Sequence, residues 1–311
     1  MLHFFIRKKV LCLLTGLLII LSTACDVQAD VTLNAANFPD EHFRNWLKEN
    51  VAQGKNILTK AQIASVEEMD ISYSEISDLK GLEYFTALTG LICFSNNLKS
   101  LDVSKNPTMA MLRCNGNELS SLDLTKSKAL QILSCDQNNL KTLDISALPN
   151  LQALSCRYNE LTTLDLSHNP ALWDLDIWGN GLTTLDVSKN TGLIKLNCLD
   201  NPIKELDLSK NRSLSEAALP ETATVTLPGG DKIRMADFKI AKTANGMYQL
   251  DLSRFADKIS SVSVEAEGVD EEVSVSVSKG VYSFAACDGK VKIAYKLGGD
   301  AVLDLIVFVE K

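Results

Sequence analysis

The feature that most constrains this chain is a cysteine that returns every 21 residues through its middle part. A fixed period of this length predicts one supersecondary unit copied in tandem, in which neighbouring copies bury each other's apolar face. One period carries Ile177 where the cysteine is expected, so the cysteine fills a small apolar slot. The recurring residues are Cys93, Cys114, Cys135, Cys156 and Cys198.

Six units of 21 residues align without gaps from residue 88 to residue 213, with the shared form LxxLxCxxNxLxxLDLSxNPx. Apolar residues at positions 4 and 6 of the unit predict a short strand with these two side chains inward, and the LD[LVI] run predicts a second extended segment on the opposite wall. Position 9 is Asn in every unit. An inward Asn can satisfy backbone groups that no strand ladder reaches, and stacked Asn side chains can also bond each other.

This pattern is the leucine-rich repeat signature, and the chain resembles the bacterial internalins, most closely their 21-residue cysteine-ladder subtype. The preceding unit, residues 66–87, has 22 residues and resembles the ordinary internalin repeat. The resemblance implies a mainly β fold with a small α cap. Residues 66–213 would form a right-handed leucine-rich repeat solenoid of about seven coils, and residues 214–311 an immunoglobulin-like β-sandwich domain.

The ladder cysteines predict buried free thiols. Parallel strands lie ~4.8 Å apart, whereas the Cβ atoms of a disulfide lie ~3.5–4.5 Å apart. The ladder holds an odd number of cysteines, five, and it has no CxxC pair of the kind that a zinc site needs. Neither a metal site nor a cofactor is therefore expected.

Residues 1–29 predict a signal peptide, with Arg7, Lys8 and Lys9 before an apolar stretch. The run that ends at Cys25 resembles a bacterial lipobox, so we expect lipidation of Cys25 and a lipid-anchored extracytoplasmic protein. Ordinary cleavage after Ala29, with secretion, is the alternative. Cleavage before Cys25 removes three basic residues and changes the formal charge from −8 to −8 − 3 = −11, which disfavours nucleic acid and anionic lipid as partners.

Residues 31–65 resemble the helical cap of bacterial surface repeat proteins, a degenerate half EF-hand. Thr59 and Gln62 form a capping box at the start of a helix. The positions of calcium ligands hold Val51, Gln53, Lys55 and Gln62, so calcium is not expected. After residue 213, short alternating runs separated by glycine pairs and Asn-Gly or Asp-Gly turns predict the strands of the sandwich.

Enzyme motifs are absent from the sequence: it has no HExxH, GxSxG, Walker or GxGxxG pattern. A second ladder of aspartates faces outward on the second wall, where a structural role with turn amides is favoured over a row of cation sites. Its members are Asp102, Asp123, Asp144, Asp165, Asp186 and Asp207.

The concave strands carry mostly small or polar outward residues, with one aromatic and charged exception in the fourth and fifth aligned units. Exposed aromatic side chains among polar neighbours are typical of protein hot spots and of platforms for sugar rings. The candidate ligand-binding residues are Arg157, Tyr158, Trp173, Asp174, Asp176 and Trp178, and Arg113, Asp136 and Lys195 extend the patch.

These residues predict a monomeric, non-catalytic protein that adheres to a host protein or glycan through the concave face. Docking within a bacterial envelope or nutrient-capture assembly is the alternative. Position 7 of the unit points outward, so truncation of Trp178 is expected to leave thermal stability nearly unchanged. The opposing interpretation is that Trp178 shields the strand edge and Trp173 leans onto the next coil.

Overall fold

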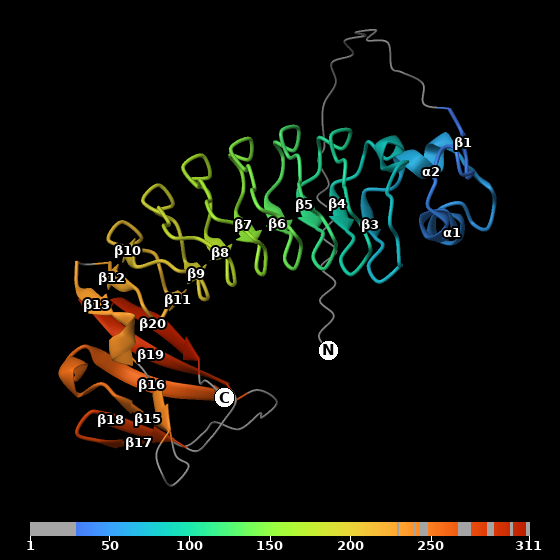
Figure 1. Cartoon of the computed structure of the whole chain (residues 1–311). Coiled ribbons are helices and arrows are strands. Elements are labelled where there is room, and N and C mark those ends of the chain that lie inside the picture. Colours follow the sequence, from blue (N-terminus) through green and yellow to red (C-terminus); the bar gives the residue numbers. More distant parts are fainter. Residues whose placement is uncertain are drawn as a thin grey trace, which may run out of the picture.

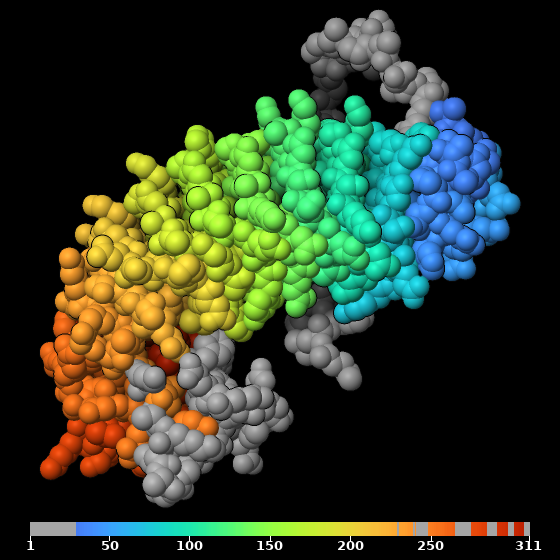
Figure 2. Space-filling model, in the orientation of Figure 1, coloured from blue at the N-terminus to red at the C-terminus, as the bar shows by residue number. Residues whose placement is uncertain are grey.

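The computed structural model describes residues 29–228, 230–238, 240–242, 248–266, 275–284, 289–298 and 301–308. The predicted signal peptide with Cys25, and also Cys287, lie outside the described residues. Figure 1 shows a curved solenoid with a small helical cap at its N-terminal end and β-sheets at its C-terminal end. In the space-filling view, successive coils form parallel bands along this curve (Figure 2).

The N-terminal cap consists of two short helices and a two-stranded sheet. Strands β1 (Val31–Thr32) and β2 (Ile57–Leu58) pair antiparallel. Helix α1 (Glu41–Asn50) lies between them in the chain, and helix α2 (Lys60–Ala64) comes after β2. The predicted capping box of Thr59 and Gln62 opens α2. Asp40 caps α1 and also accepts hydrogen bonds from the Ser77 amide (2.8 Å) and hydroxyl (2.7 Å), so it ties the cap to the first coil.

The concave wall of the solenoid is a parallel sheet with one short strand from each coil. Each strand is centred on a buried residue that pairs in register with its equivalent in the next coil, for example Leu112 with Leu133 and Leu154 with Leu175. The strands are β3 (Glu68–Asp70), β4 (Gly90–Ile92), β5 (Met111–Arg113), β6 (Ile132–Ser134), β7 (Ala153–Ser155), β8 (Asp174–Asp176), β9 (Lys195–Asn197) and β11 (Glu216–Ala218).

Strand β11 adds an eighth coil to the seven that the sequence predicts. Its unit keeps the inward positions 1, 4 and 6, because Leu214, Ala217 and Leu219 are all buried. The pattern was hidden because Ala217 replaces the usual leucine and Thr222 replaces the ladder asparagine.

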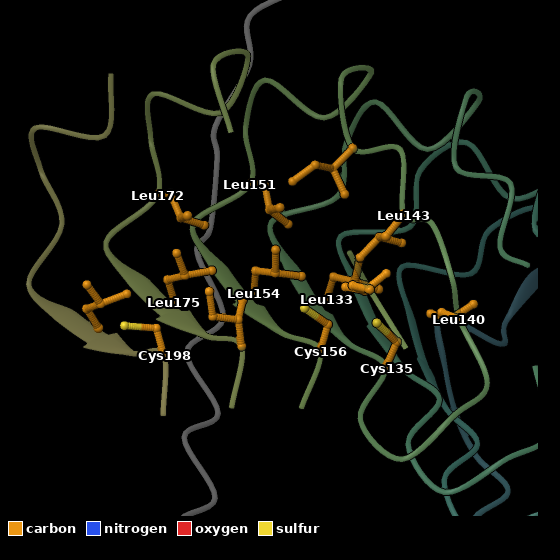
Figure 3. Close-up of a cluster of buried hydrophobic side chains, with 14 of the residues drawn as sticks. Leu133, Cys135, Leu140, Leu143, Leu151, Leu154, Cys156, Leu172, Leu175 and Cys198 are labelled. Atoms are coloured by element: carbon orange, nitrogen blue, oxygen red, sulfur yellow. The ribbon is translucent and has the colours of Figure 1, made fainter. Parts of the chain in front are cut away.

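The five ladder cysteines are free and buried, as predicted. Figure 3 shows Cys135, Cys156 and Cys198 among the buried leucines of the solenoid core. Ile177 is 0% exposed, like these cysteines, and occupies the equivalent slot in its coil. Burial of the thiol raises the pKa of Cys114 to about 12, so this side chain stays a neutral, small apolar group.

Two ladders of buried asparagine amides join neighbouring coils. At position 9, Asn138 accepts a hydrogen bond from the Leu119 amide (3.0 Å) and donates to the carbonyls of Cys114 (3.0 Å) and Cys135 (3.1 Å). The predicted satisfaction of backbone groups is therefore confirmed. A second ladder of asparagines stands at position 19, for which the sequence predicted no role. Each side-chain amide donates to a carbonyl of the preceding coil; the residues are Asn106, Asn169, Asn190 and Asn211.

The described residues of the C-terminal region form three groups of strands and two short 3-10 helices, Met235–Phe238 and Ser253–Phe255; another such helix, Leu82–Tyr84, lies in the first coil. Strands β10 (Glu205–Asp207), β12 (Thr224–Thr226) and β13 (Lys232–Arg234) form one sheet. Strands β14 (Ile240–Lys242), β15 (Tyr248–Asp251), β18 (Val281–Phe284) and β17 (Val275–Ser278) form another, and β16 (Ile259–Ala266), β19 (Gly289–Gly298) and β20 (Ala301–Phe308) pair antiparallel.

The concave sheet runs on into this C-terminal region. Strand β20 pairs parallel with β11, with Leu305 opposite Ala217, and so builds one sheet of 11 strands. The division of the chain between residues 213 and 214 stays a prediction, but the sheet itself continues across that position.

Candidate functional site

A hollow of about 580 Å³ lies on the concave side of the coils that contain β3 to β8. We call it the concave groove. Small side chains at Ser95, Ser134, Ala153 and Ser155 contribute to its lining and leave room above the sheet. The larger and charged lining residues are Tyr73, Phe94, Arg113, Asn115, Ile132, Asp136, Gln137, Arg157, Asp174 and Asp176.

A buried aspartate holds an arginine in the middle of the groove. Asp136 is 4% exposed. One carboxylate oxygen accepts from the Ser155 hydroxyl (2.6 Å) and the Arg157 amide (2.8 Å), and the other accepts from Arg157 Nε and Nη2 (3.2 Å each). Arg157 Nε also lies 3.8 Å from Asp176. Asp136 thus holds the Arg157 guanidinium in place through two charge-assisted hydrogen bonds.

Strand β8 supplies two further carboxylates. Burial raises the pKa of Asp176, and the Trp178 amide and Arg157 oppose this shift. Burial also raises the pKa of Asp174, and the charge of Lys195 on the neighbouring strand β9 opposes this shift. Both carboxylates are partly stripped of water, and this strengthens any hydrogen bond that they accept.

Two of the candidate residues, Tyr158 and Trp178, lie beside the groove rather than in it. The two ring centroids are 5.1 Å apart. Trp178 packs against a small buried cluster of Leu199, Ala218 and Ile306, and its indole N–H donates to Asp200. Because Ile306 belongs to β20, Trp178 contacts the C-terminal region. This packing favours the opposing interpretation, in which truncation of Trp178 lowers stability.

Trp178 borders a second, mainly apolar hollow of about 670 Å³. Its lining includes Leu219, Met235, Phe238 and Ile306, so it lies where the last coils meet the C-terminal strands. Trp173 is 38% exposed and lines neither hollow. Of the six candidate residues, the concave groove thus contains Arg157, Asp174 and Asp176. Of the three residues that extended the patch, it contains Arg113 and Asp136 but not Lys195.

The sequence reasoning missed an aromatic pair at the N-terminal end of the groove. The rings of Tyr73 and Phe94 meet edge to face, with centroids 5.0 Å apart. Tyr73 is 74% exposed, the largest fraction among the large apolar side chains in the described residues. The pair repeats the arrangement of Tyr158 and Trp178, since position 8 of one coil meets position 7 of the next. Aligning residues 66–87 with the later units would have revealed it.

The outward aspartate ladder has the structural role that the sequence favoured. The Asp123 carboxylate accepts hydrogen bonds from the Thr125 amide (2.9 Å) and hydroxyl (2.7 Å), which lower its pKa. The other ladder aspartates accept equivalent bonds from the amide two residues later. No grouping of His, Cys, Asp and Glu that suits a metal ion is found among the residues that the structure describes.

Known proteins share this solenoid. Internalin F from Listeria monocytogenes strain 4b F2365 superposes with a TM-score of 0.57 and 20% identity, over 66% of this chain and 62% of that chain. Internalin C2 from the same strain superposes with a TM-score of 0.56 and 20% identity, over 62% of this chain and 89% of that chain. In sequence, Listeria internalin J is 39% identical over 70 residues, which is 22% of this chain and 8% of internalin J.

The family described as the LRR domain of the endo-beta-N-acetylglucosaminidase EndoS matches residues 38–216. This match begins in the cap and ends within β11, so it contains the whole concave groove. It covers more than half of the chain, and the chain belongs to this family of leucine-rich repeat domains, with an internalin-like solenoid.

Proposed function

We propose that this chain is a non-catalytic, monomeric binding protein that holds a protein or glycan ligand in the concave groove and so serves adhesion. The observation that carries the proposal is the network of Asp136, Arg157 and Asp176. The coil does not require charges at position 7, since Phe94 and Leu199 occupy the same position in other coils. A buried carboxylate that orients a half-exposed guanidinium toward an open hollow is typical of a prepared recognition site.

A pulldown and glycan-array comparison of the mature protein tests this proposal. Arg157→Gln should lose ligand capture, because it removes the only guanidinium that Asp136 holds among the described residues. The matched control is Arg212→Gln, a change of the same type at an exposed position that lies outside the groove lining. Equal capture by the two variants would show that the ligand does not use the groove.

The alternative function is docking within a bacterial envelope or nutrient-capture assembly, and the second hollow favours it. Its apolar lining at the junction with the C-terminal strands, next to the Tyr158–Trp178 pair, is of the kind that protein partners fill with an apolar side chain. Copurification of one fixed bacterial protein, lost in Ala236→Asp, a change at an exposed residue of this lining, but not in Arg157→Gln, would support this alternative over adhesion.

We further propose that the protein is exported and anchored by a lipid on Cys25. The sequence around residues 21–25 supports this proposal. Within the described ranges, no helix is long and apolar enough to cross a membrane. Mass spectrometry of the mature N-terminus tests the anchor: Cys25→Ala should release the protein into the soluble fraction, and a wild-type N-terminus at Asp30 would exclude lipidation.

A further inference from the structure

The concave groove offers both hydrogen-bond donors and hydrogen-bond acceptors to a ligand. Since parallel strands lie ~4.8 Å apart, the five spacings from β3 to β8 make it about 24 Å long, enough for several linked rings rather than one small molecule. Arg113 and Arg157 offer donors, and Asp174 and Asp176 offer acceptors. A ligand that lies along the groove therefore meets donors in the coils of β5 and β7 and then acceptors on β8.

The net charge of the groove disfavours an anionic ligand. Two arginines and three aspartates line it, so the formal sum is 2 − 3 = −1. Arg157 is also already engaged by Asp136 at 3.2 Å, so part of its charge is neutralised within the protein. A ligand hydroxyl can donate to a carboxylate and accept from a guanidinium, so a neutral polyhydroxylated chain satisfies both kinds of group.

Apolar surfaces are present at one end and on the floor. Tyr73 stands 74% exposed with Phe94 packed against its ring, and Ile132 is 36% exposed on strand β6. An aromatic ring has a negative face, which attracts the weakly positive C–H groups on the flat side of a pyranose. The backbone of Tyr73 is left-handed, with φ 53°, as it is at the equivalent position of later coils, for example Ser95 and Gln137.

A protein ligand fits these features less well. The core of a protein interface is depleted of charged residues and rich in apolar area, whereas the middle of this groove is an ion pair flanked by serines. Strands β4 to β8 are paired on both sides, and β3, the edge strand of the sheet, has its open side facing away from β4. A peptide therefore finds no free strand edge inside the groove to extend.

We propose that the concave groove binds a neutral oligosaccharide, with one sugar ring against Tyr73 and Phe94 and later hydroxyls on Arg113, Arg157, Asp174 and Asp176. This inference rests on the proposed function and deepens it, because it assigns the ligand of the groove to one chemical class.

Calorimetric titration of the full mature protein tests the inference. The probes are neutral cello-, chito- and galacto-oligosaccharides, with oligogalacturonate as the anionic counterpart. At least one neutral probe should bind, and more tightly than oligogalacturonate. Tyr73→Ala should weaken binding about tenfold, the scale of one lost aromatic contact. Tyr73→Asn, which tolerates the left-handed backbone, should show the same loss and so separates loss of the ring from backbone strain.

Ile194→Ala is the matched control. Ile194 is 39% exposed, just before strand β9, and lies outside the groove lining, so its truncation should leave binding unchanged. Tighter binding of oligogalacturonate would overturn the inference. The inference would also be overturned if the protein bound no saccharide but captured a protein, and Arg157→Gln abolished that capture. This second result would leave the proposed function standing. If the protein captured neither saccharide nor protein, both would fail.

Discussion

Replacement of one ladder asparagine should cost much more stability than its size suggests. Asn138 is 6% exposed, and its amide serves two coils at once: it accepts from the Leu119 amide and donates to the Cys114 and Cys135 carbonyls. In Asn138→Ala the Leu119 amide keeps no acceptor. The neighbouring ladder residues Asn117 and Asn159 still donate to the two carbonyls, so each carbonyl loses one of its bonds rather than all of them.

The magnitude follows from these contacts. A buried donor left without a partner costs about 1–3 kcal/mol, and each lost hydrogen bond about 0.5–1.5 kcal/mol. One orphaned amide and two weakened carbonyls therefore add up to about 4 kcal/mol. Urea unfolding measures this loss, and hydrogen exchange at the Leu119 amide locates it. Asn139→Ala is the matched control, because the adjacent Asn139 side chain is exposed.

An unfolding free energy of Asn138→Ala within about 1 kcal/mol of that of Asn139→Ala would refute this role of the asparagine ladder. The role is also refuted if exchange at Leu119 stays as slow as in the wild type, because the amide would then have kept a partner. Either result would mean that packing of the leucines, and not the asparagine ladder, holds adjacent coils in register.

Three further results are expected. Cys135→Val should fold normally, whereas Cys135→Asp should unfold nearby coils, because an unpaired charge in the core costs several kcal/mol. The ladder thiols should react with alkylating reagents only after unfolding, since they are buried and burial raises their pKa. Trp178→Ala should lower the free energy of unfolding by about 2 kcal/mol, less than truncation of a fully buried Trp, and should speed hydrogen exchange in β11 and β20. Unchanged exchange in these strands would contradict the packing of Trp178 on Ile306. Ligand affinity should fall as the pH drops through the raised pKa of Asp176, because ligand hydroxyls donate more strongly to the ionised carboxylate. Asp176→Asn should flatten this pH dependence of affinity.

The repeat was predictable because each coil repeats the same inward pattern. Leu112, Leu133 and Leu154 occupy equivalent places in successive strands, and the period alone fixes that equivalence. The eighth coil was missed because Ala217 and Thr222 depart from the pattern, although burial of Leu214 and Leu219 still forms a coil there. A consensus detects conserved residue types, whereas the fold requires only burial at certain positions.

The site was less predictable, because it depends on contacts between coils. Position 7 is not uniformly exposed, since Asp136 and Leu199 are buried there, and the sequence did not show that Trp178 contacts Ile306, more than one hundred residues later. The partnership of Asp136 with Arg157 joins residues 21 apart, and it follows from the period only once a side-chain direction is known. The Tyr73–Phe94 pair was missed because the 22-residue unit was set apart from the six aligned ones.

The continuation of the concave sheet into β20 determines the order in which the solenoid and its C-terminal end can form. Adjacent coils join residues 21 apart, as in Leu196 and Ala217, whereas the last ladder joins Ala217 to Leu305, 305 − 217 = 88 residues later. Closing the longer loop costs about 1.3 kcal/mol more chain entropy, from (3/2)RT ln(88/21). Coils can therefore assemble one after another as the chain emerges. The open side of β11 stays unpaired until residues 301–308 arrive, so β20 covers the strand edge that the last coil would otherwise expose to other chains.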